Sequence, residues 1–481
     1  MPTLTPLRRD AAYQVGIFVS GDGTRGLPYR DWLATRTVAV VGLAKSGIAA
    51  ARLLRRLGTR VLASDSGAPE SLTAEARALE REGVALWAGG HPEEAFRDAE
   101  LVVVSPGVPL DLPALTAARA RGVPIIGELE LAWRVMEADC LAITGTNGKT
   151  TTTTLTGELL RTQVRPVMVG GNIGTPLAEH ALEFPGDGIV VAEVSSFQLD
   201  TIDRFRPRVA AVLNVTPDHL DRHGTFERYV DAKARILANQ TATDCAVLNA
   251  DDPVTAGLAA RARGRVIWFS RTATLPHGVF IYDGWIVAKL NGSTERICPV
   301  SEITLRGQHN VENVLAATAC ALWTGMAPSA IRRGIAAFRG VAHRIERVHD
   351  DRGVVYYNDS KGTNVDSTVK ALQSFSEPIV LIAGGKGKGQ DFTPLAEAAR
   401  GRVRRAILIG QDRDRIRAAL EAASIPAEDA ESMEDAVRRA REAARVGDVV
   451  LLSPACASFD MFRNYEHRGD VFKAVVRALL G

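Results

Sequence analysis

Residues 141–160 constrain the fold more than any other segment of this chain. A short apolar run is followed by a loop that contains Gly145, Gly148 and Lys149, and then by a stretch of helical composition at 152–160. Glycines let a backbone curl around anionic oxygens, and the N-terminus of the following helix offers N–H groups and partial positive charge. This order predicts a phosphate-binding loop between a strand and a helix of an α/β sheet.

The predicted loop is a short variant of the usual phosphate-binding loop, because its two glycines are only three positions apart. Lys149 supplies a point charge for β- and γ-phosphates, and a hydroxyl of Thr150 or Thr151 can reach Mg²⁺. The alternative is an ordinary glycine turn followed by a surface lysine. The strand before the loop and the helix after it favour nucleotide binding.

The same alternation of short apolar runs, loop residues and helical stretches recurs along the chain, which predicts mostly parallel sheets with crossover helices. At roughly 150 residues per domain, 481 residues correspond to about three units. The fold expected is α/β, in three units. Their predicted bounds are 36–130, 131–341 and 342–481, after an extension of unknown role at 1–35.

Charge and cysteine content narrow the function classes. Lys and Arg number 58 against 56 Asp and Glu, so the chain lacks the positive field expected of a nucleic-acid binder. The five cysteines are widely separated and include no CxxC pair, so the sequence indicates neither a zinc module nor a disulfide framework and fits a reducing compartment. No apolar run reaches the length of a membrane span. We expect a cytoplasmic protein without membrane insertion or nucleic-acid binding.

Two further residues are candidate metal ligands. Glu193 ends an apolar strand, where nucleotide-dependent enzymes often hold a carboxylate for the metal. His219 follows the strand at 209–213, although magnesium prefers oxygen ligands and a histidine in such a loop is as often structural.

Lys233 lies on the apolar stripe of a helix rather than on its charged face, together with Phe226, Val230 and Leu237. A lysine directed at the core needs an anion or a modification. Carbamylation would convert it into a carboxylate-like metal ligand, whereas the alternative is a stem that carries its ammonium group to water.

The motifs occur in an order that resembles the Mur ligase family of peptidoglycan synthesis, over about residues 36–481. The residues that carry this resemblance are the segments 145–151, 193–199, 214–219 and 307–313 and the pair His343 and Arg344. Within that family, the segments 358–364, 384–391 and 453–460 resemble the branch that adds D-glutamate.

The resemblance implies an N-terminal Rossmann-like domain, a central P-loop-type ATPase domain and a C-terminal Rossmann-like domain. It also implies an activity and its reactants. An ATP-dependent ligase would add D-glutamate to UDP-N-acetylmuramoyl-L-alanine through an acyl phosphate and a tetrahedral intermediate, giving ADP and phosphate. The implied partners are these three reactants, and the implied cofactor is Mg²⁺, as two ions. The implied assembly is a monomer.

The resemblance also implies a set of site residues. Lys149, His219 and Lys233 would be catalytic, with Lys233 carbamylated, and Thr150, Glu193, His219 and Lys233 would serve the metal ions. ATP would contact Gly145, Thr146, Asn147, Gly148, Lys149, Thr150, Thr151, Asn310, Asn313, Arg344 and Asp359. The UDP-sugar would contact Ser46, Asp65 and Asn172, and D-glutamate would contact Lys361, Thr363, Lys388, Ser458 and Tyr465.

Three alternatives remain at the level of sequence. Gly42, Ala44 and Gly47 with Asp65 downstream resemble a dinucleotide fingerprint and so a dehydrogenase, although Ala44 replaces the glycine that admits a pyrophosphate. A non-catalytic nucleotide-binding protein would keep the loop and lose the chemistry. A folylpolyglutamate-type ligase would share the loop and lack the segments 358–364 and 453–460.

Overall fold

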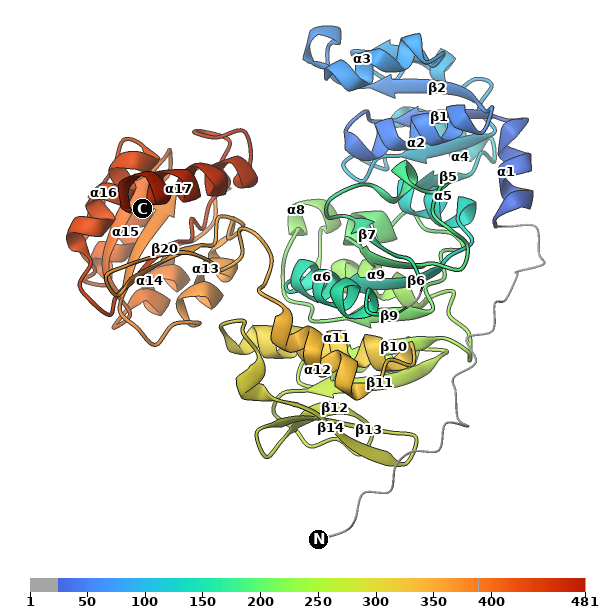
Figure 1. The fold of residues 1–481 in the computed structure, drawn as a ribbon. Coiled ribbons are helices and arrows are strands. Elements are labelled where there is room, and N and C mark those ends of the chain that lie inside the picture. The colour runs from blue at the N-terminus through green and yellow to red at the C-terminus, as the bar shows by residue number, and fades with distance from the viewer. Residues whose placement is uncertain (1–24, 164, 388, 481) are drawn as a thin grey trace. The chain divides into compact units, whose positions relative to one another are not determined.

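A computed structural model describes residues 25–163, 165–387 and 389–480, whose elements are labelled in Figure 1. The described residues up to 300, together with 312–335, form one compact unit, and residues 301–311 and 336–480 form a second. The first unit contains two sheets and the second unit contains one. The predicted α/β class with mostly parallel sheets is confirmed.

The first sheet has five parallel strands in the order β3-β2-β1-β4-β5. This order is typical of a Rossmann-like sheet, whose ligands bind where the strand order reverses, here beside β1. Its elements are β1 (Thr37–Val41), β2 (Arg60–Asp65), β3 (Ala85–Ala88), β4 (Leu101–Val104), β5 (Ile125–Gly127), α1 (Leu27–Ala34), α2 (Lys45–Arg56), α3 (Ala74–Arg81), α4 (Pro113–Ala120) and α5 (Glu128–Val135).

Helix α1 falls within the stretch predicted as an extension, and its described residues are part of the fold. Tyr29 and Leu33 are buried, and the Gly26 amide donates to the Arg134 carbonyl of α5 at 2.7 Å. Residues 1–24 of the predicted extension lie outside the described residues. The part that the structure describes therefore packs onto the first unit.

The second sheet has nine strands in the order β14-β13-β12-β11-β10-β9-β6-β8-β7. The strands from β7 to β12 are parallel, and β13 and β14 add an antiparallel edge. The strands are β6 (Asp139–Thr144), β7 (Val167–Gly171), β8 (Ile189–Glu193), β9 (Val209–Val212), β10 (Cys245–Asn249), β11 (Arg265–Ser270), β12 (Gly278–Tyr282), β13 (Trp285–Leu290) and β14 (Ser293–Pro299). The helices that follow in the chain are α6 (Lys149–Leu160), α7 (Ser196–Leu199), α8 (Leu220–His223), α9 (Phe226–Ala234), α10 (Pro253–Gly257), α11 (Gln308–Trp323) and α12 (Pro328–Ala337).

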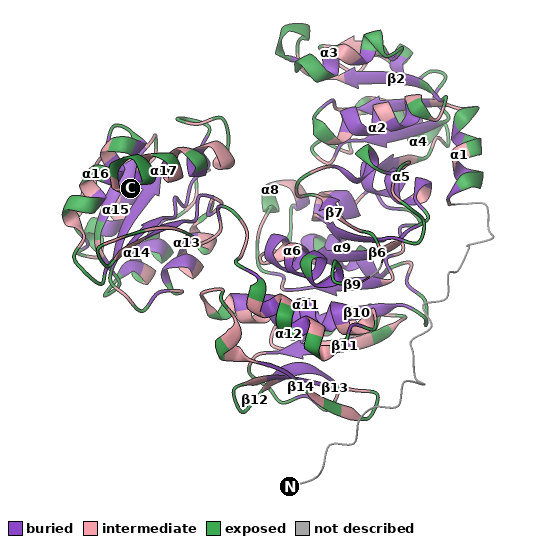
Figure 2. Ribbon diagram, viewed as in Figure 1, coloured by how far each residue is buried: buried purple, intermediate pink, exposed green. Residues whose placement is uncertain are grey.

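Central strands of the second sheet are buried on both faces, which explains their continuous apolar sequences (Figure 2). One hydrophobic core contains residues of both the first and the second sheet, for example Val40 of β1 and Val212 of β9. The two sheets of the first unit therefore share a core.

The third sheet, in the second unit, has the order β15-β16-β20-β17-β18-β19, with β15 antiparallel and the other strands parallel. Two separate cores cover its two faces. Its elements are β15 (Glu346–Asp351), β16 (Val354–Asn358), β17 (Ile379–Gly384), β18 (Val403–Ile409), β19 (Ala427–Asp429), β20 (Val449–Leu452), α13 (Val365–Leu372), α14 (Thr393–Ala399), α15 (Arg413–Ala422), α16 (Met433–Ala443) and α17 (Tyr465–Leu480).

Strand order brings the predicted site loops together within each sheet. In the second sheet β6 lies between β8 and β9, so the loops that follow these three strands meet at one edge. In the third sheet β20 lies between β16 and β17, which brings the segments after 358, 452 and 384 to one edge. Among the described residues, no helix combines the length and the apolar character that crossing a membrane requires.

Candidate active site

The loop after β6 is held in shape by the segment that follows β9. The Asn214 side chain binds the Asn147 backbone on both sides, accepting from its N–H at 2.9 Å and donating to its carbonyl at 3.1 Å. The Thr146 amide donates to the Asn214 carbonyl at 2.9 Å, and the Thr146 hydroxyl donates to the Thr216 carbonyl at 3.1 Å. Because two neighbouring strand ends share these bonds, the loop is fixed before any ligand binds.

Two glycines of this loop have backbone conformations that side chains disfavour, with φ of 154° at Gly145 and 85° at Gly148. A Cβ at position 148 would lie 2.2 Å from Oδ1 of Asn313, so the side chain of α11 lies directly against the loop. Thr152 donates to the same Oδ1 at 3.2 Å.

Helix α6 begins at Lys149, three residues before the predicted start, because Gly148 forms its N-cap. Its N-terminus therefore faces the loop, as a phosphate site requires.

Two lysines donate to one carbonyl of the loop. The Lys149 Nζ lies 2.7 Å from the Gly145 oxygen and 2.7 Å from the Thr146 oxygen. The Lys233 Nζ lies 2.9 Å from the same Gly145 oxygen and 4.6 Å from the centre of the Tyr229 ring. The loop thus collects two cationic groups where anionic phosphates are expected.

Lys233 is 1% exposed, as predicted for a core-directed lysine. The helix buries Tyr229, Ala232 and Lys233. Phe226 and Val230, which belong to the predicted apolar stripe, are only half-buried, so the buried face of the helix is rotated by about one residue relative to that stripe. Burial first, and then the charge of Lys149, lower the pKa of Lys233 well below that of an ordinary lysine. A neutral amine is the form that this environment favours.

Glu193, at the carboxyl end of β8, is buried next to the loop. Its Oε2 accepts from the Thr150 hydroxyl at 2.8 Å, and its Oε1 accepts from the Asn172 amide at 2.8 Å. Asn172, predicted as a UDP-sugar contact, therefore lies beside this carboxylate and apart from Ser46 and Asp65 on the first sheet. A carboxylate and a hydroxyl beside a phosphate loop suit Mg²⁺, which takes its other ligands from phosphate and water. Accordingly, no cluster of three metal-binding side chains occurs in the described part of the chain.

His219 lies at the start of α8 with a left-handed backbone, φ 51°. Its side chain is 44% exposed, its Nε2 lies 3.7 Å from an Asp218 oxygen, and its ring packs edge-on against Phe197 with centres 5.0 Å apart. A strained residue held in this way is typical of a functional position.

A second histidine, His223, escaped the sequence-based prediction. It is buried, and its ring nitrogens lie 3.0 Å from the Ser196 hydroxyl and 3.8 Å from an Asp200 oxygen. Burial lowers the pKa of His223. Its ring packs on Phe197 and Tyr229, so it supports the residues around His219. The signal in the sequence was its position four residues after His219.

The first-sheet site residues meet at the strand-order reversal. Asp65 accepts from the Leu43 amide at 2.6 Å and from the Gly67 amide at 2.7 Å, so it braces the turn after β1. Gly47 is required there, because a Cβ would lie 1.8 Å from the Gly42 carbonyl oxygen. Ser46 is half-buried in the first turn of α2.

In the second unit, Asp359 follows β16 and is buried. It accepts from the Ser453 hydroxyl at 2.7 Å and from the Ile345 amide at 3.3 Å, and burial raises its pKa to about 7. Arg344 is half-buried beside it in the chain turn that includes His343 and Ile345, both at positive φ. Asn310 donates to the Arg306 carbonyl at 2.7 Å.

Four of the predicted amino-acid contacts lie on loops at one edge of the third sheet. Lys361 and Thr363 follow β16, Ser458 follows β20, and Tyr465 begins α17. The Lys361 Nζ lies 5.1 Å from the centre of the Tyr465 ring, and Ser458 is buried. Lys388 lies outside the described residues.

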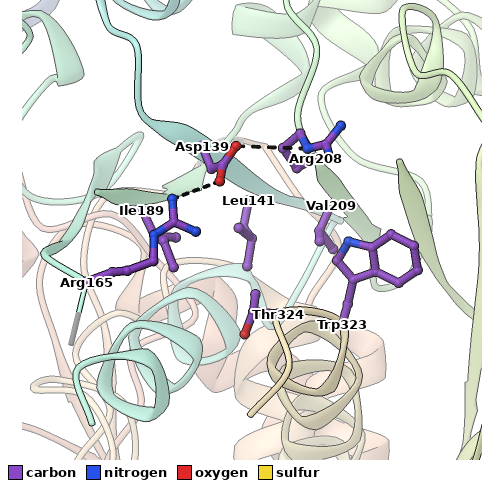
Figure 3. Close-up of a pocket in the computed structure, with 8 residues that line it drawn as sticks. All are labelled: Asp139, Leu141, Arg165, Ile189, Arg208, Val209, Trp323 and Thr324. Carbon is purple, nitrogen blue, oxygen red and sulfur yellow. Dashed lines mark hydrogen bonds and ion pairs between the residues drawn. The ribbon is translucent and has the colours of Figure 1, made fainter. Parts of the chain in front are cut away.

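A small cavity of about 40 Å³ lies at the opposite end of the second sheet (Figure 3). Asp139, at the start of β6, pairs there with Arg165 at 2.8 Å and with Arg208 at 3.9 Å. A cavity of this size holds water rather than a nucleotide. This cavity lies apart from the phosphate-binding loop, which follows the carboxyl end of β6.

Comparison with known proteins identifies the family. Three family models match the chain: the MurD-like N-terminal domain at 36–127, the Mur ligase middle domain at 143–321, and the Mur ligase glutamate ligase domain at 343–456. Among solved structures, the chain is similar to the UDP-N-acetylmuramate–alanine ligase of Thermotoga maritima, with a TM-score of 0.60, 21% identity and coverage of 92% of this chain and 100% of the other. A pseudomurein peptide ligase from Methanothermus fervidus aligns with a TM-score of 0.58, 17% identity and the same coverage. These two likenesses show the fold.

The chain belongs to the Mur ligase family, an expectation of the sequence that is thereby confirmed. Within it, the curated relatives are UDP-N-acetylmuramoylalanine–D-glutamate ligases. The protein of Acidobacterium capsulatum is 50% identical over 93% of this chain and 98% of its own length. The proteins of Koribacter versatilis and Pelotomaculum thermopropionicum are both 48% identical over 92% of this chain and 98% of theirs.

Proposed function

We propose that this chain joins D-glutamate to the L-alanyl carboxylate of UDP-N-acetylmuramoyl-L-alanine at the expense of ATP, in peptidoglycan precursor synthesis. The observation that carries the proposal is the loop of residues 145–151, where Lys149, Lys233 and Glu193 converge beside a helix N-terminus. Relatives that carry this activity in their names match nearly the whole chain.

The reaction follows from the chemistry of its reactants. A carboxylate is a poor acyl donor, so one of its oxygens first attacks the γ-phosphorus of ATP, and the bond from that phosphorus to the bridging oxygen breaks to release ADP. The amine of D-glutamate then attacks the carbonyl carbon of the acyl phosphate. The tetrahedral intermediate expels phosphate and leaves the amide. Catalysis is mainly positioning and charge stabilisation.

The phosphate-binding loop provides both the positioning and the charge stabilisation. Its backbone from Gly145 to Thr151 binds the phosphates, and Lys149 balances negative charge that develops on the transferred group. Asn313, already against the loop, and Asn310 on the same helix meet the adenine side. By the same proposal, Arg344 and Asp359 would contact phosphate and ribose.

The hydroxyl of Thr150 and the carboxylate of Glu193 are oxygen donors, which Mg²⁺ prefers. Thr150 and Glu193 would hold one ion, and His219 and a carbamylated Lys233 would lie at a second. Bound Mg²⁺ neutralises phosphate charge and polarises the phosphoryl group. Lys233 suits carbamylation, because its depressed pKa favours the neutral amine that adds to CO₂.

The proposed substrate residues come from all three sheets: Ser46 and Asp65 from the first, Asn172 from the second and the amino-acid contacts from the third. Ser46, Asp65 and Asn172 contact the UDP-sugar. Lys361 and Lys388 neutralise the carboxylates of D-glutamate, and Thr363, Ser458 and Tyr465 complete that site. The chain acts as a cytoplasmic monomer, because one copy provides every proposed contact and ATP is a reactant.

The test is phosphate release from ATP and Mg²⁺ with UDP-N-acetylmuramoyl-L-alanine and a panel of amino acids. We expect stoichiometric phosphate and a new amide with D-glutamate, and neither with L-glutamate, meso-diaminopimelate or L-lysine. Equal rates with another amino acid would assign a different acceptor, and no ADP with any acceptor would refute the proposal.

A further inference from the structure

Arg468, on α17, is the largest side chain in the described part of the chain that is fully buried. Its Nε donates to the Ser360 hydroxyl at 2.9 Å and one terminal nitrogen donates to the Ser360 carbonyl at 2.8 Å. The other terminal nitrogen donates to the carbonyls of Cys456 at 3.1 Å and Ala457 at 3.4 Å. Each of its three nitrogens therefore has an acceptor.

These acceptors lie on two different loops. Ser360 belongs to the loop after β16, which carries Lys361 and Thr363, and Cys456 and Ala457 belong to the loop after β20, which carries Ser458. The Ser360 hydroxyl in turn donates to the Tyr465 carbonyl at 2.8 Å, at the start of α17. One guanidinium thus joins three segments of the edge at which the proposed amino-acid contacts gather.

The arrangement uses the planar fork of arginine rather than its charge alone. The hydrogen bonds described for Arg468 go to carbonyl and hydroxyl oxygens, and burial lowers its pKa to about 10, so the charge is held in an unfavourable environment. A lysine offers one point of donation and cannot span both loops with fixed angles. The surroundings are tight, since a Cβ at Gly385 would lie 3.3 Å from a terminal nitrogen.

The adjoining backbone is also strained. Ala455, next to the acceptor Cys456, has a φ of 59°, which is uncommon for a residue with a side chain. Such a conformation persists where the surroundings fix it, and the bond from Arg468 to the Cys456 carbonyl is one such restraint. The loop that leads to Ser458 is therefore held by this arginine.

We propose that Arg468 is a positioning residue for the amino-acid substrate. It sets the spacing between the Lys361–Thr363 segment and Ser458 without touching the substrate. This inference rests on the proposed function, because it assumes that these loops bind D-glutamate.

The experiment compares steady-state constants of the full chain with Arg468→Lys and Arg468→Met. We expect the KM for D-glutamate to increase about 10-fold in the lysine variant and about 100-fold in the methionine variant, because displacement of contact groups by about 1 Å weakens productive binding by such factors. The KM values for ATP and for the nucleotide-sugar should stay within about twofold of wild type.

The matched control is Arg404→Lys in the same unit. Arg404 forms a two-point ion pair with Asp448, at 2.8 and 3.1 Å, near the amino ends of β18 and β20. Because lysine cannot form this two-point pair, we expect Arg404→Lys to be less stable and to have an unchanged KM for D-glutamate. If the loss of any structural arginine had this effect, the KM for D-glutamate would rise in Arg404→Lys as well as in Arg468→Lys.

A third variant keeps the test decisive if Arg468 substitutions prevent folding. Ser360→Ala removes one acceptor and the bond to Tyr465, and we expect a rise of about threefold to tenfold in the KM for D-glutamate alone. Unchanged KM for D-glutamate in folded variants, or parallel changes for all three substrates, would overturn the inference. Failure of wild type to make an amide would instead refute the proposed function.

Discussion

Lys149 and Lys233 donate to the same oxygen, the carbonyl of Gly145, at 2.7 and 2.9 Å. Burial first, and then the charge of Lys149, lower the pKa of Lys233 well below that of an ordinary lysine. In the proposed function Lys149 provides the charge for the phosphates, and burial favours the neutral amine of Lys233. This division of roles leads to the first two predictions.

Lys233→Ala is expected to be inactive and to regain part of its activity with a short-chain carboxylate such as acetate or formate. A small carboxylate can occupy the space of a carbamate and restore an oxygen ligand near Glu193. Turnover against carboxylate concentration measures this effect, with wild type showing no activation. A fully active alanine variant would show that the side chain only fills space.

Lys149→Ala is expected to lower turnover by about two to three orders of magnitude or more, since loss of a preorganised charge at a transition state costs about 3–4 kcal/mol. Phosphate release under saturating substrates measures the effect. Lys289→Ala, on the exposed side of β13, serves as the control and should retain wild-type turnover. Near-normal turnover of Lys149→Ala would remove this residue from the mechanism.

Thr150→Val is expected to raise the Mg²⁺ concentration for half-maximal activity by roughly tenfold or more, because the hydroxyl that bridges to Glu193 is lost. The matched control is Thr153→Val on the same helix. The Thr153 hydroxyl is buried and has no hydrogen-bond partner among the described residues, so its removal should leave the Mg²⁺ dependence unchanged. Equal Mg²⁺ curves for both variants would contradict the metal assignment.

Glu128 should make the first unit less stable as pH rises. Burial raises its pKa to about 7 from an ordinary 4.5, so the folded state binds a proton that the unfolded state releases between these values. The free energy of unfolding therefore decreases by about 3 kcal/mol as the pH rises from about 4.5 to 7, and this contribution is constant above pH 7. Glu128→Gln should reduce this pH dependence, measured as the melting temperature between pH 5 and pH 8.

Glu130, two residues further along α5, is the control for that measurement. It is equally buried, and it accepts from the amides of residues 203–205 and from Arg134. Glu130→Gln should lower the melting temperature at both pH values, by the equivalent of about 2–3 kcal/mol. An unchanged pH dependence in Glu128→Gln would contradict the assigned pKa.

Strands were the most predictable part of the fold. The buried runs of β1, β8 and β9 carry their own signal, because a parallel strand covered on both faces must be apolar throughout. Edge strands lack that signal for two different reasons. Strand β3 is only four residues long and none of them is fully buried, and β15 mixes charged with apolar residues. Their pairing depends on neighbours that are distant in sequence.

The phosphate-binding loop could be predicted because its residues are adjacent in sequence. The residues that hold this loop in place are distant in sequence. Asn214 binds the backbone of Asn147, which is 67 positions away in sequence, and Arg468 binds Ser360, which is 108 positions away. Asn172 and Glu193 meet only because β7 and β8 are neighbours. Contacts of this kind depend on strand order, which no motif reports.

The central claim is that the carboxylate of the nucleotide-sugar accepts the γ-phosphoryl group, and isotope transfer tests it most directly. The substrate carboxylate is labelled with ¹⁸O, the full reaction is run with ATP, Mg²⁺ and D-glutamate, and the released phosphate is examined by mass spectrometry. The account predicts one ¹⁸O atom in each phosphate, carried over from the acyl phosphate. Unlabelled phosphate accompanied by amide product would contradict it.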